Sequence, residues 1–112
     1  MVELNSTDLL HHRVAGSPTL TNAKEARALL DATFSELEAS GADGGHRTIE
    51  ISLAGVTDGN SVLVSLMLVW MRRARKAGVG ILFVDIPPLV SNLIEFTGLD
   101  DVLPMARAGA AA

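Results

Sequence analysis

Residues 60–84 read NSVLVSLMLVWMRRARKAGVGILFV, and this stretch decides the fold. At about 100° per residue its apolar side chains gather on one face that includes Trp70, which predicts a helix over residues 61–77. The glycines that follow predict the end of this helix, and the aliphatic run that closes the stretch predicts a buried strand. A strand predicted at residues 48–53, with alternating apolar and polar side chains, precedes the helix. Together these segments predict a βαβ unit with parallel strands and a right-handed crossover.

The N-terminal part of the chain predicts a hairpin followed by a helix. The hairpin is expected from a short strand that begins at Val2, a turn at residues 6–8 and a returning strand over residues 9–15. Asn22 and Glu25 have the spacing of a capping box, in which two side chains satisfy free N–H groups at a helix start. Apolar residues at three- and four-residue spacing then continue to Leu37, which predicts one amphipathic helix against a sheet.

The C-terminal part predicts one more helix and completes the order of elements. Pro87-Pro88 favours a helix start, Gly98 favours its end, and the helix between them carries Leu89, Leu93 and Phe96. The predicted order is β-β-α-β-α-β-α. The polar face of the strand before the long helix indicates that helices cover mainly one side of the sheet. The fold class is therefore α/β, with one small mixed sheet of about four strands; a doubly wound nucleotide-binding fold is the alternative.

Composition predicts a single globular domain and disfavours two classes of partner. The chain has 112 residues, of which 48% are hydrophobic and 20% charged, which is typical of one folded domain. We expect that domain to span residues 1–105 and the Ala/Gly-rich residues 106–112 to be frayed. A net charge of −4 disfavours nucleic acids. The longest apolar stretch, residues 62–71, is about half as long as a bilayer span. With no signal-peptide pattern at the N-terminus, we expect a cytoplasmic protein that does not insert into a membrane.

The chain lacks the motifs that carry common enzyme chemistry. It contains no cysteine, no Gly-Lys pair for a phosphate loop and no Gly-x-Ser-x-Gly elbow. Its three histidines lack the spacing of a zinc site, so we expect no metal and no cofactor. Asp58 and Asp85 follow predicted strands, where α/β proteins often place functional groups. Solvated loop carboxylates are nevertheless the simpler interpretation of both.

The outer face of the predicted helix over residues 61–77 carries apolar residues where a helix on a sheet should be polar. Val64, Leu68 and Val69 lie among the hydroxyls near the helix start and the arginines near its end. They either flank a wide core stripe or form a docking surface with an apolar centre and a polar rim. The candidate partner-binding residues are Asn60, Ser61, Val64, Ser65, Leu68, Val69 and Arg72.

Ser61 has two candidate roles at the start of this helix. Its hydroxyl, or the side chain of Asn60, caps the free N–H groups of the first turn. Alternatively, Ser61 is a phosphorylation site. A phosphate there would lie at the positive end of the helix dipole but would disrupt an apolar interface with a partner.

These features resemble the STAS domain family, which is named after sulfate transporters and anti-sigma factor antagonists. In that family a strand leads through a loop into an Asp-Ser/Thr pair that opens a helix, and Asn60-Ser61 stands at this position. The resemblance covers most of the chain and is strongest over residues 49–104. The segments similar to the STAS subunit of the bacterial Mla phospholipid-transport ABC system are residues 63–78, 83–88 and 93–104.

The resemblance implies a non-catalytic cytoplasmic subunit, peripheral to the inner membrane through its partner. It would bind and regulate the ATPase of an ABC phospholipid transporter and so maintain outer-membrane lipid asymmetry. The alternative implication is an anti-sigma factor antagonist that a regulatory kinase switches by phosphorylating Ser61. Asn60 in place of aspartate, and Val62-Leu63 in place of small residues, favour the first. A third hypothesis, an enzyme or small-ligand carrier, would use Asp58 and Asp85.

Overall fold

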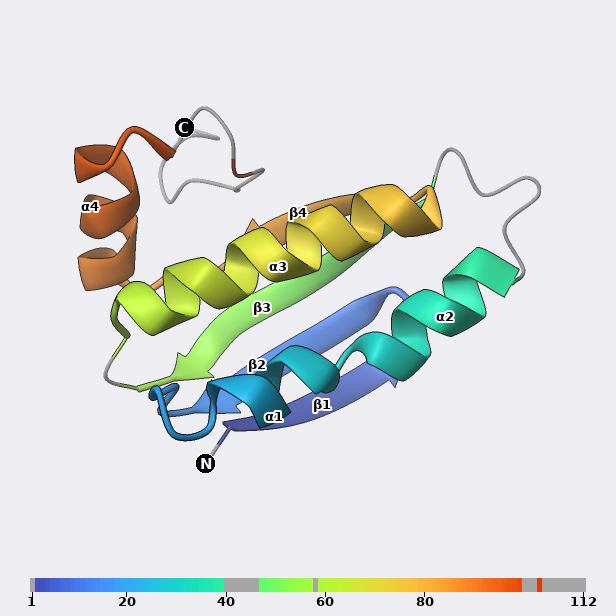
Figure 1. Cartoon of the computed structure of the whole chain (residues 1–112), viewed down its shortest axis with the longest axis horizontal. Coiled ribbons are helices and arrows are strands. Elements are labelled where there is room, and N and C mark those ends of the chain that lie inside the picture. The colour runs from blue at the N-terminus through green and yellow to red at the C-terminus, as the bar shows by residue number, and fades with distance from the viewer. Residues whose placement is uncertain (1, 40–46, 58, 100–102, 104–112) are drawn as a thin grey trace.

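The computed structural model describes residues 2–39, 47–57, 59–99 and 103, and it contains a four-stranded mixed sheet (Figure 1). The strands lie side by side in chain order: β1 (Val2–Asp8), β2 (His11–Gly16), β3 (Thr48–Val56) and β4 (Gly80–Val84). β1 and β2 are antiparallel, whereas β2–β3 and β3–β4 are parallel. The predicted α/β class, the mixed sheet and the parallel pair around the long helix are confirmed. The predicted tail at residues 106–112 lies outside the described residues.

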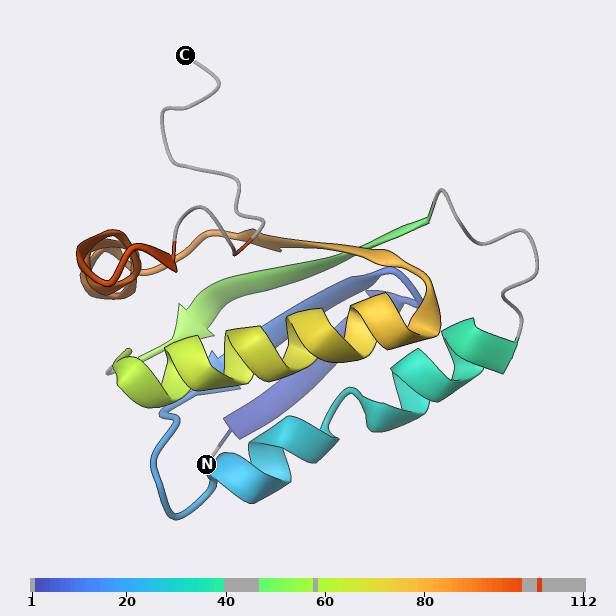
Figure 2. The ribbon, with the colours of Figure 1, turned by 45° about the horizontal axis from the view of Figure 1, so that its top comes forward.

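In the described part of the chain, the helices are α1 (Ala23–Ala28), α2 (Asp31–Ala39), α3 (Ser61–Ala77) and α4 (Pro88–Phe96). α1, α2 and α3 lie along one face of the sheet, as predicted (Figures 1 and 2). α4 lies near the N-terminal end of α3 and contacts it. Across the described residues, no helix is long and apolar enough to cross a membrane.

The single helix predicted between the hairpin and β3 is wrong, because two helices stand there. The N–H of Leu29 donates to the carbonyl of Ala26 over 3.2 Å, which closes a tight turn instead of continuing α1. The indole N–H of Trp70 donates to the carbonyl of Arg27 over 3.4 Å and takes the place of a helical partner. The observed order is therefore β-β-α-α-β-α-β-α.

The predicted capping box at the start of α1 is also wrong. The side chain of Asn22 makes no cap: its Oδ1 accepts from the N–H of Thr19 over 2.8 Å, and its Nδ2 donates to the carbonyl of Ser17 over 3.0 Å. Asn22 therefore shapes the loop before the helix, and its side chain is no longer available to the first turn.

The hairpin turn lies later than predicted, because β1 continues through Asp8. The carboxylate of Asp8 accepts from the N–H groups of Leu10 and His11 over 2.8 and 3.0 Å, which fixes the turn at residues 9–10. The adjacent histidines point to opposite faces of β2: His11 is exposed and His12 is buried. His46 lies outside the described residues.

α3 is the central helix of the core. Trp70 is only 1% exposed and belongs to the same buried cluster as Ile49 and Ile51 of β3. The alternation predicted for β3 is confirmed, because its even-numbered residues from 48 to 54 are exposed or half-buried. The predicted glycine cap of α3 is confirmed at Gly78, whose φ of 78° is the left-handed conformation that glycine adopts without strain.

The fully buried residues of α4 are not the apolar residues by which the sequence predicted this helix. Leu89 and Phe96 are 75% and 90% exposed, while Val90 and Ile94 are fully buried. Both sets of residues recur at helical spacing, so periodicity could not choose between them. The contact of Val90 with the loop before α3 fixes which side faces inward.

Candidate docking surface

Asn60 starts α3, and its side chain caps the helix. Asn60 has an extended backbone, and its Oδ1 accepts from the N–H of Val62 over 2.8 Å. This bond satisfies one of the free donors at the helix start, so capping falls to Asn60 and not to Ser61. Ser61 is the first helical residue and is exposed, which leaves its hydroxyl at the positive end of the helix dipole.

The loop before α3 is fastened to two other parts of the chain. The Nδ2 of Asn60 donates to the carbonyl of Pro18 over 3.2 Å, in the segment that precedes α1. On the other side, Gly59 packs so closely against α4 that an added Cβ would lie 2.5 Å from the Cγ2 of Val90. Contacts with two segments distant in sequence therefore set the position of Ser61.

The structure brings most of the predicted site residues to the outer face of α3. Asn60, Ser61, Ser65 and Arg72 are exposed, Leu68 and Val69 are half-buried, and Val64 is buried. Of the two alternatives predicted for Val64, the structure supports the flank of a wide core stripe, because its side chain is 7% exposed; Val64 is therefore not an exposed docking residue. Helical geometry places Val64 with the buried Met71 on the flank turned away from α1, and α4 packs near that flank.

The polar side chains of this face differ in how firmly they are held. The hydroxyl of Ser65 donates to the carbonyl of Ser61 over 3.2 Å, one turn earlier in the same helix. Arg72 makes no hydrogen bond or ion pair with the described residues. Its neighbour Arg73 instead donates to the carboxylate of Glu38 on α2 over 3.2 Å. Among these side chains, Arg72 is thus available to a partner and Arg73 braces α2 against α3.

The flank of α3 that faces α1, on the other side of the helix from Val64, lines a shallow apolar groove of about 190 Å³. The sequence did not predict this groove. Ser65 and Val69 lie on its α3 side, and Leu20 and Ala23 lie on its α1 side. Leu20 is 88% exposed. The signal available in the sequence was a lone leucine in a loop of polar residues, which is also common at ordinary surfaces.

Of the two carboxylates predicted near strand ends, the structure describes Asp85. Asp85 follows β4 with a positive φ of 55°, and it accepts a hydrogen bond from the hydroxyl of Ser52 over 2.8 Å. Asp58 lies outside the described residues. The part of the chain that the structure describes contains no group of three His, Cys, Asp or Glu residues that could hold a metal ion. Asp85 is therefore accounted for by a local contact with β3.

The order of strands and helices matches that of the STAS fold. The chain matches the family model described as "Mlab, STAS domain" over residues 13–104, and it belongs to the STAS domain family. A search of curated protein sequences found no match.

Solved structures of anti-sigma factor antagonists share this fold. Unphosphorylated SpoIIAA superposes with a TM-score of 0.66 at 18% identity, covering 99% of this chain and 92% of that one. The phosphorylated Bacillus cell fate determinant SpoIIAA gives 0.59 at 18% identity, with coverage of 99% and 96%. An antagonist from Mycobacterium paratuberculosis gives 0.53 at 20% identity, with coverage of 96% and 86%. These likenesses establish the fold.

Proposed function

We propose that this chain is a non-catalytic cytoplasmic STAS subunit that binds and regulates the ATPase of an ABC phospholipid transporter, serving outer-membrane lipid asymmetry. The observation that carries the proposal is the outer face of α3 in a chain that matches the Mlab model. Ser61, Leu68 and Arg72 share this face at helical spacing: an exposed hydroxyl, a half-buried aliphatic side chain and an exposed arginine. An apolar centre with a polar rim suits a protein interface.

Regulation by such a subunit needs no chemistry of its own. If it binds one conformation or assembly state of the ATPase more tightly than another, linkage requires that it stabilise that state. The outer face of α3 would supply this differential contact, while the sheet and the buried face of α3 keep it rigid.

Co-expression with the ATPase of an Mla-type transporter tests the proposal. The wild-type chain is expected to co-purify with the ATPase, and Ser61→Glu and Leu68→Asp are expected to reduce capture at least about tenfold, because each places a charge in the interface. Thr7→Glu is the matched control, since it makes the same change from hydroxyl to carboxylate on exposed β1. Absence of co-purification, or equal capture of all variants with unchanged melting temperatures, would refute it.

A second candidate function is an anti-sigma factor antagonist that a kinase switches by phosphorylating Ser61. It is favoured by the exposed position of Ser61 and by the capping role of Asn60, which leaves the Ser61 hydroxyl unneeded in the first turn. Intact-mass measurement on protein isolated from its own cells distinguishes the two. A phosphate-sized increment that disappears in Ser61→Ala supports the switch, and its absence under all growth conditions argues for the transporter subunit.

A further inference from the structure

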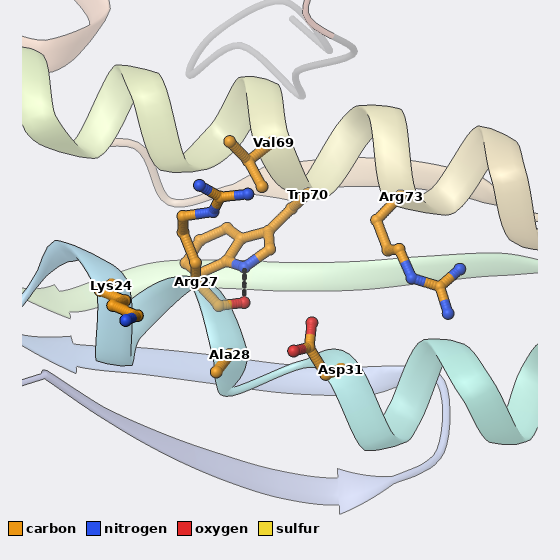
Figure 3. A pocket seen from close by; sticks show the side chains of 7 residues that line it. All are labelled: Lys24, Arg27, Ala28, Asp31, Val69, Trp70 and Arg73. Atoms are coloured by element: carbon orange, nitrogen blue, oxygen red, sulfur yellow. Dashed lines mark hydrogen bonds between the residues drawn. The ribbon is translucent and has the colours of Figure 1, made fainter.

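A basic groove lies where α1 ends and α2 begins, facing α3 (Figure 3). Its volume is about 380 Å³, within the range of small-molecule sites. Trp70 and Val69 line it from α3, and the side chain of Arg27 extends from α1 toward Val69. The break between α1 and α2 shapes the groove, and the hydrogen bond from Trp70 to the carbonyl of Arg27 holds that break in place.

Positive charge dominates this groove in a chain whose net charge is −4. Lys24, Arg27 and Arg73 line it, against the single carboxylate of Asp31. The side chains of Lys24 and Arg27 make no ion pair or hydrogen bond with the described residues. Arg73 is held by Glu38, but its Nη1 is buried without a hydrogen-bond partner in the described structure. The groove thus has cationic donors for which the described residues provide no acceptor.

The basic groove continues into the apolar groove described above. Arg27 and Val69 line both, so the two share a border across the seam between α1 and α3. On one side of this border lie the cations, and on the other lie Leu20, Ala23 and the apolar residues of α3. A ligand that fills both halves must carry an anionic group at one end and an apolar body at the other.

We propose that this composite groove binds a small phosphate monoester that carries a short apolar chain. A phosphate monoester has about −1.5 to −2 charges at neutral pH, which suits Lys24 and Arg27, the two lining cations that make no ion pair with the described residues. Its oxygens accept hydrogen bonds from Arg27 and Lys24, the arginine in the two-pronged geometry that guanidinium groups favour. The apolar chain lies along Val69 and Leu20. This site borders the surface proposed to bind the ATPase, because Ser65 and Val69 line the groove and also lie on the outer face of α3. Its test nevertheless requires no partner protein.

Trp70 provides the measurement, because it is the only tryptophan and the chain has no tyrosine. Titration with n-octyl phosphate is expected to change the Trp70 emission saturably, with inorganic phosphate at least about tenfold weaker because it leaves the apolar half empty. Phosphatidylcholine vesicles with and without phosphatidic acid distinguish the source. If the protein co-sediments only with the vesicles that contain phosphatidic acid, the natural ligand is a lipid headgroup. If it binds n-octyl phosphate but co-sediments with neither kind of vesicle, the natural ligand is a soluble phosphate monoester. Absence of a saturable response to n-octyl phosphate overturns the proposal.

Substitutions locate the two halves of the site. Arg27→Gln is expected to weaken n-octyl phosphate about tenfold, and Asp31→Asn to strengthen it by removing the opposing charge. Leu20→Ser, at a side chain that is 88% exposed, should weaken binding of n-octyl phosphate but not of inorganic phosphate. Arg75→Gln, exposed on the same helix outside the groove, is the control. An Arg75→Gln variant as weak as Arg27→Gln would reduce the effect to general charge and overturn the site.

Discussion

The two flanks of α3 carry similar aliphatic side chains and differ in what covers them. Val64 is buried on the flank near α4, whereas Val69 stays half-buried because the break between α1 and α2 leaves a groove beside it. The sequence pattern of α3 alone does not distinguish the exposure of Val64 from that of Val69. The comparison teaches that the exposure of a flanking residue depends on where the neighbouring helices start and stop.

The largest expected change in unfolding free energy comes from a test that places the same charge on each flank of α3. Val64→Asp is expected to cost about 3–5 kcal/mol of unfolding free energy, because it buries a carboxylate without a partner. Val69→Asp should cost about 1 kcal/mol or less, since its side chain reaches the groove. Urea denaturation of both variants measures the difference. Equal losses would mean that the two flanks are covered alike.

A second test concerns the contact that brings α4 to α3. Gly59→Ala is expected to cost about 1–3 kcal/mol, because the new Cβ would lie 2.5 Å from the Cγ2 of Val90. Val90→Ala in the same chain should recover part of this loss by removing that methyl group. A double-mutant cycle followed by thermal unfolding measures the coupling. Strictly additive effects would contradict the close approach.

A third test separates the two residues at the start of α3. Asn60→Ala should lose about 1 kcal/mol, because the cap on the Val62 N–H disappears. Ser61→Ala should change stability by less than about 0.5 kcal/mol, since its hydroxyl is exposed. The same urea experiment compares them. A larger loss for Ser61→Ala would assign the cap to the serine.

The smallest expected effect is the pH dependence of stability that comes from the Asp8–His11 pair. This pair lies in the hairpin, away from both flanks of α3. The hydrogen bond with Asp8 raises the pKa of His11 above its ordinary 6.5, and the same bond lowers the pKa of Asp8 below 3.8. The Asp8 contribution is therefore lost as pH falls through its folded pKa, and the His11 contribution is lost as pH rises through its folded pKa. The pair stabilises most between the two ordinary values.

An NMR titration of the His11 imidazole checks this prediction. Asp8→Asn should bring the pKa of His11 down toward 6.5, because both the hydrogen bond to a carboxylate and the attraction of its charge are removed. A wild-type His11 pKa at or below 6.5 would contradict the pairing.

The sequence predicted the parts of the fold that depend on local pattern. The alternation of β3, the long amphipathic α3 and its glycine cap at Gly78 each follow from a few consecutive residues, and all are confirmed. The break between α1 and α2 could not be predicted in this way. At this break the carbonyl of Arg27 accepts a hydrogen bond from the indole of Trp70, which is 43 residues away in the chain.

The candidate site was predictable to the same extent. Ser61 and Arg72 lie on an exposed face because the helical period places them opposite Trp70. Val64 is buried on the flank of α3 near α4. The apolar residues of α4 fall on two faces, so the sequence left the orientation of α4 open. The grooves beside Val69 combine side chains of α1, α2 and α3, and no local pattern records where separate segments meet.

The fastening of Asn60 to Pro18, and of Gly59 to Val90, has a consequence for whatever recognises Ser61. The serine is presented in one preorganised geometry, so a docking protein avoids the entropic cost of ordering this corner and must fit its shape. An enzyme that reads its substrate as an extended strand would first have to release both anchors. The loop and helix start around Ser61 therefore favour a partner that fits a rigid surface over one that binds a flexible peptide.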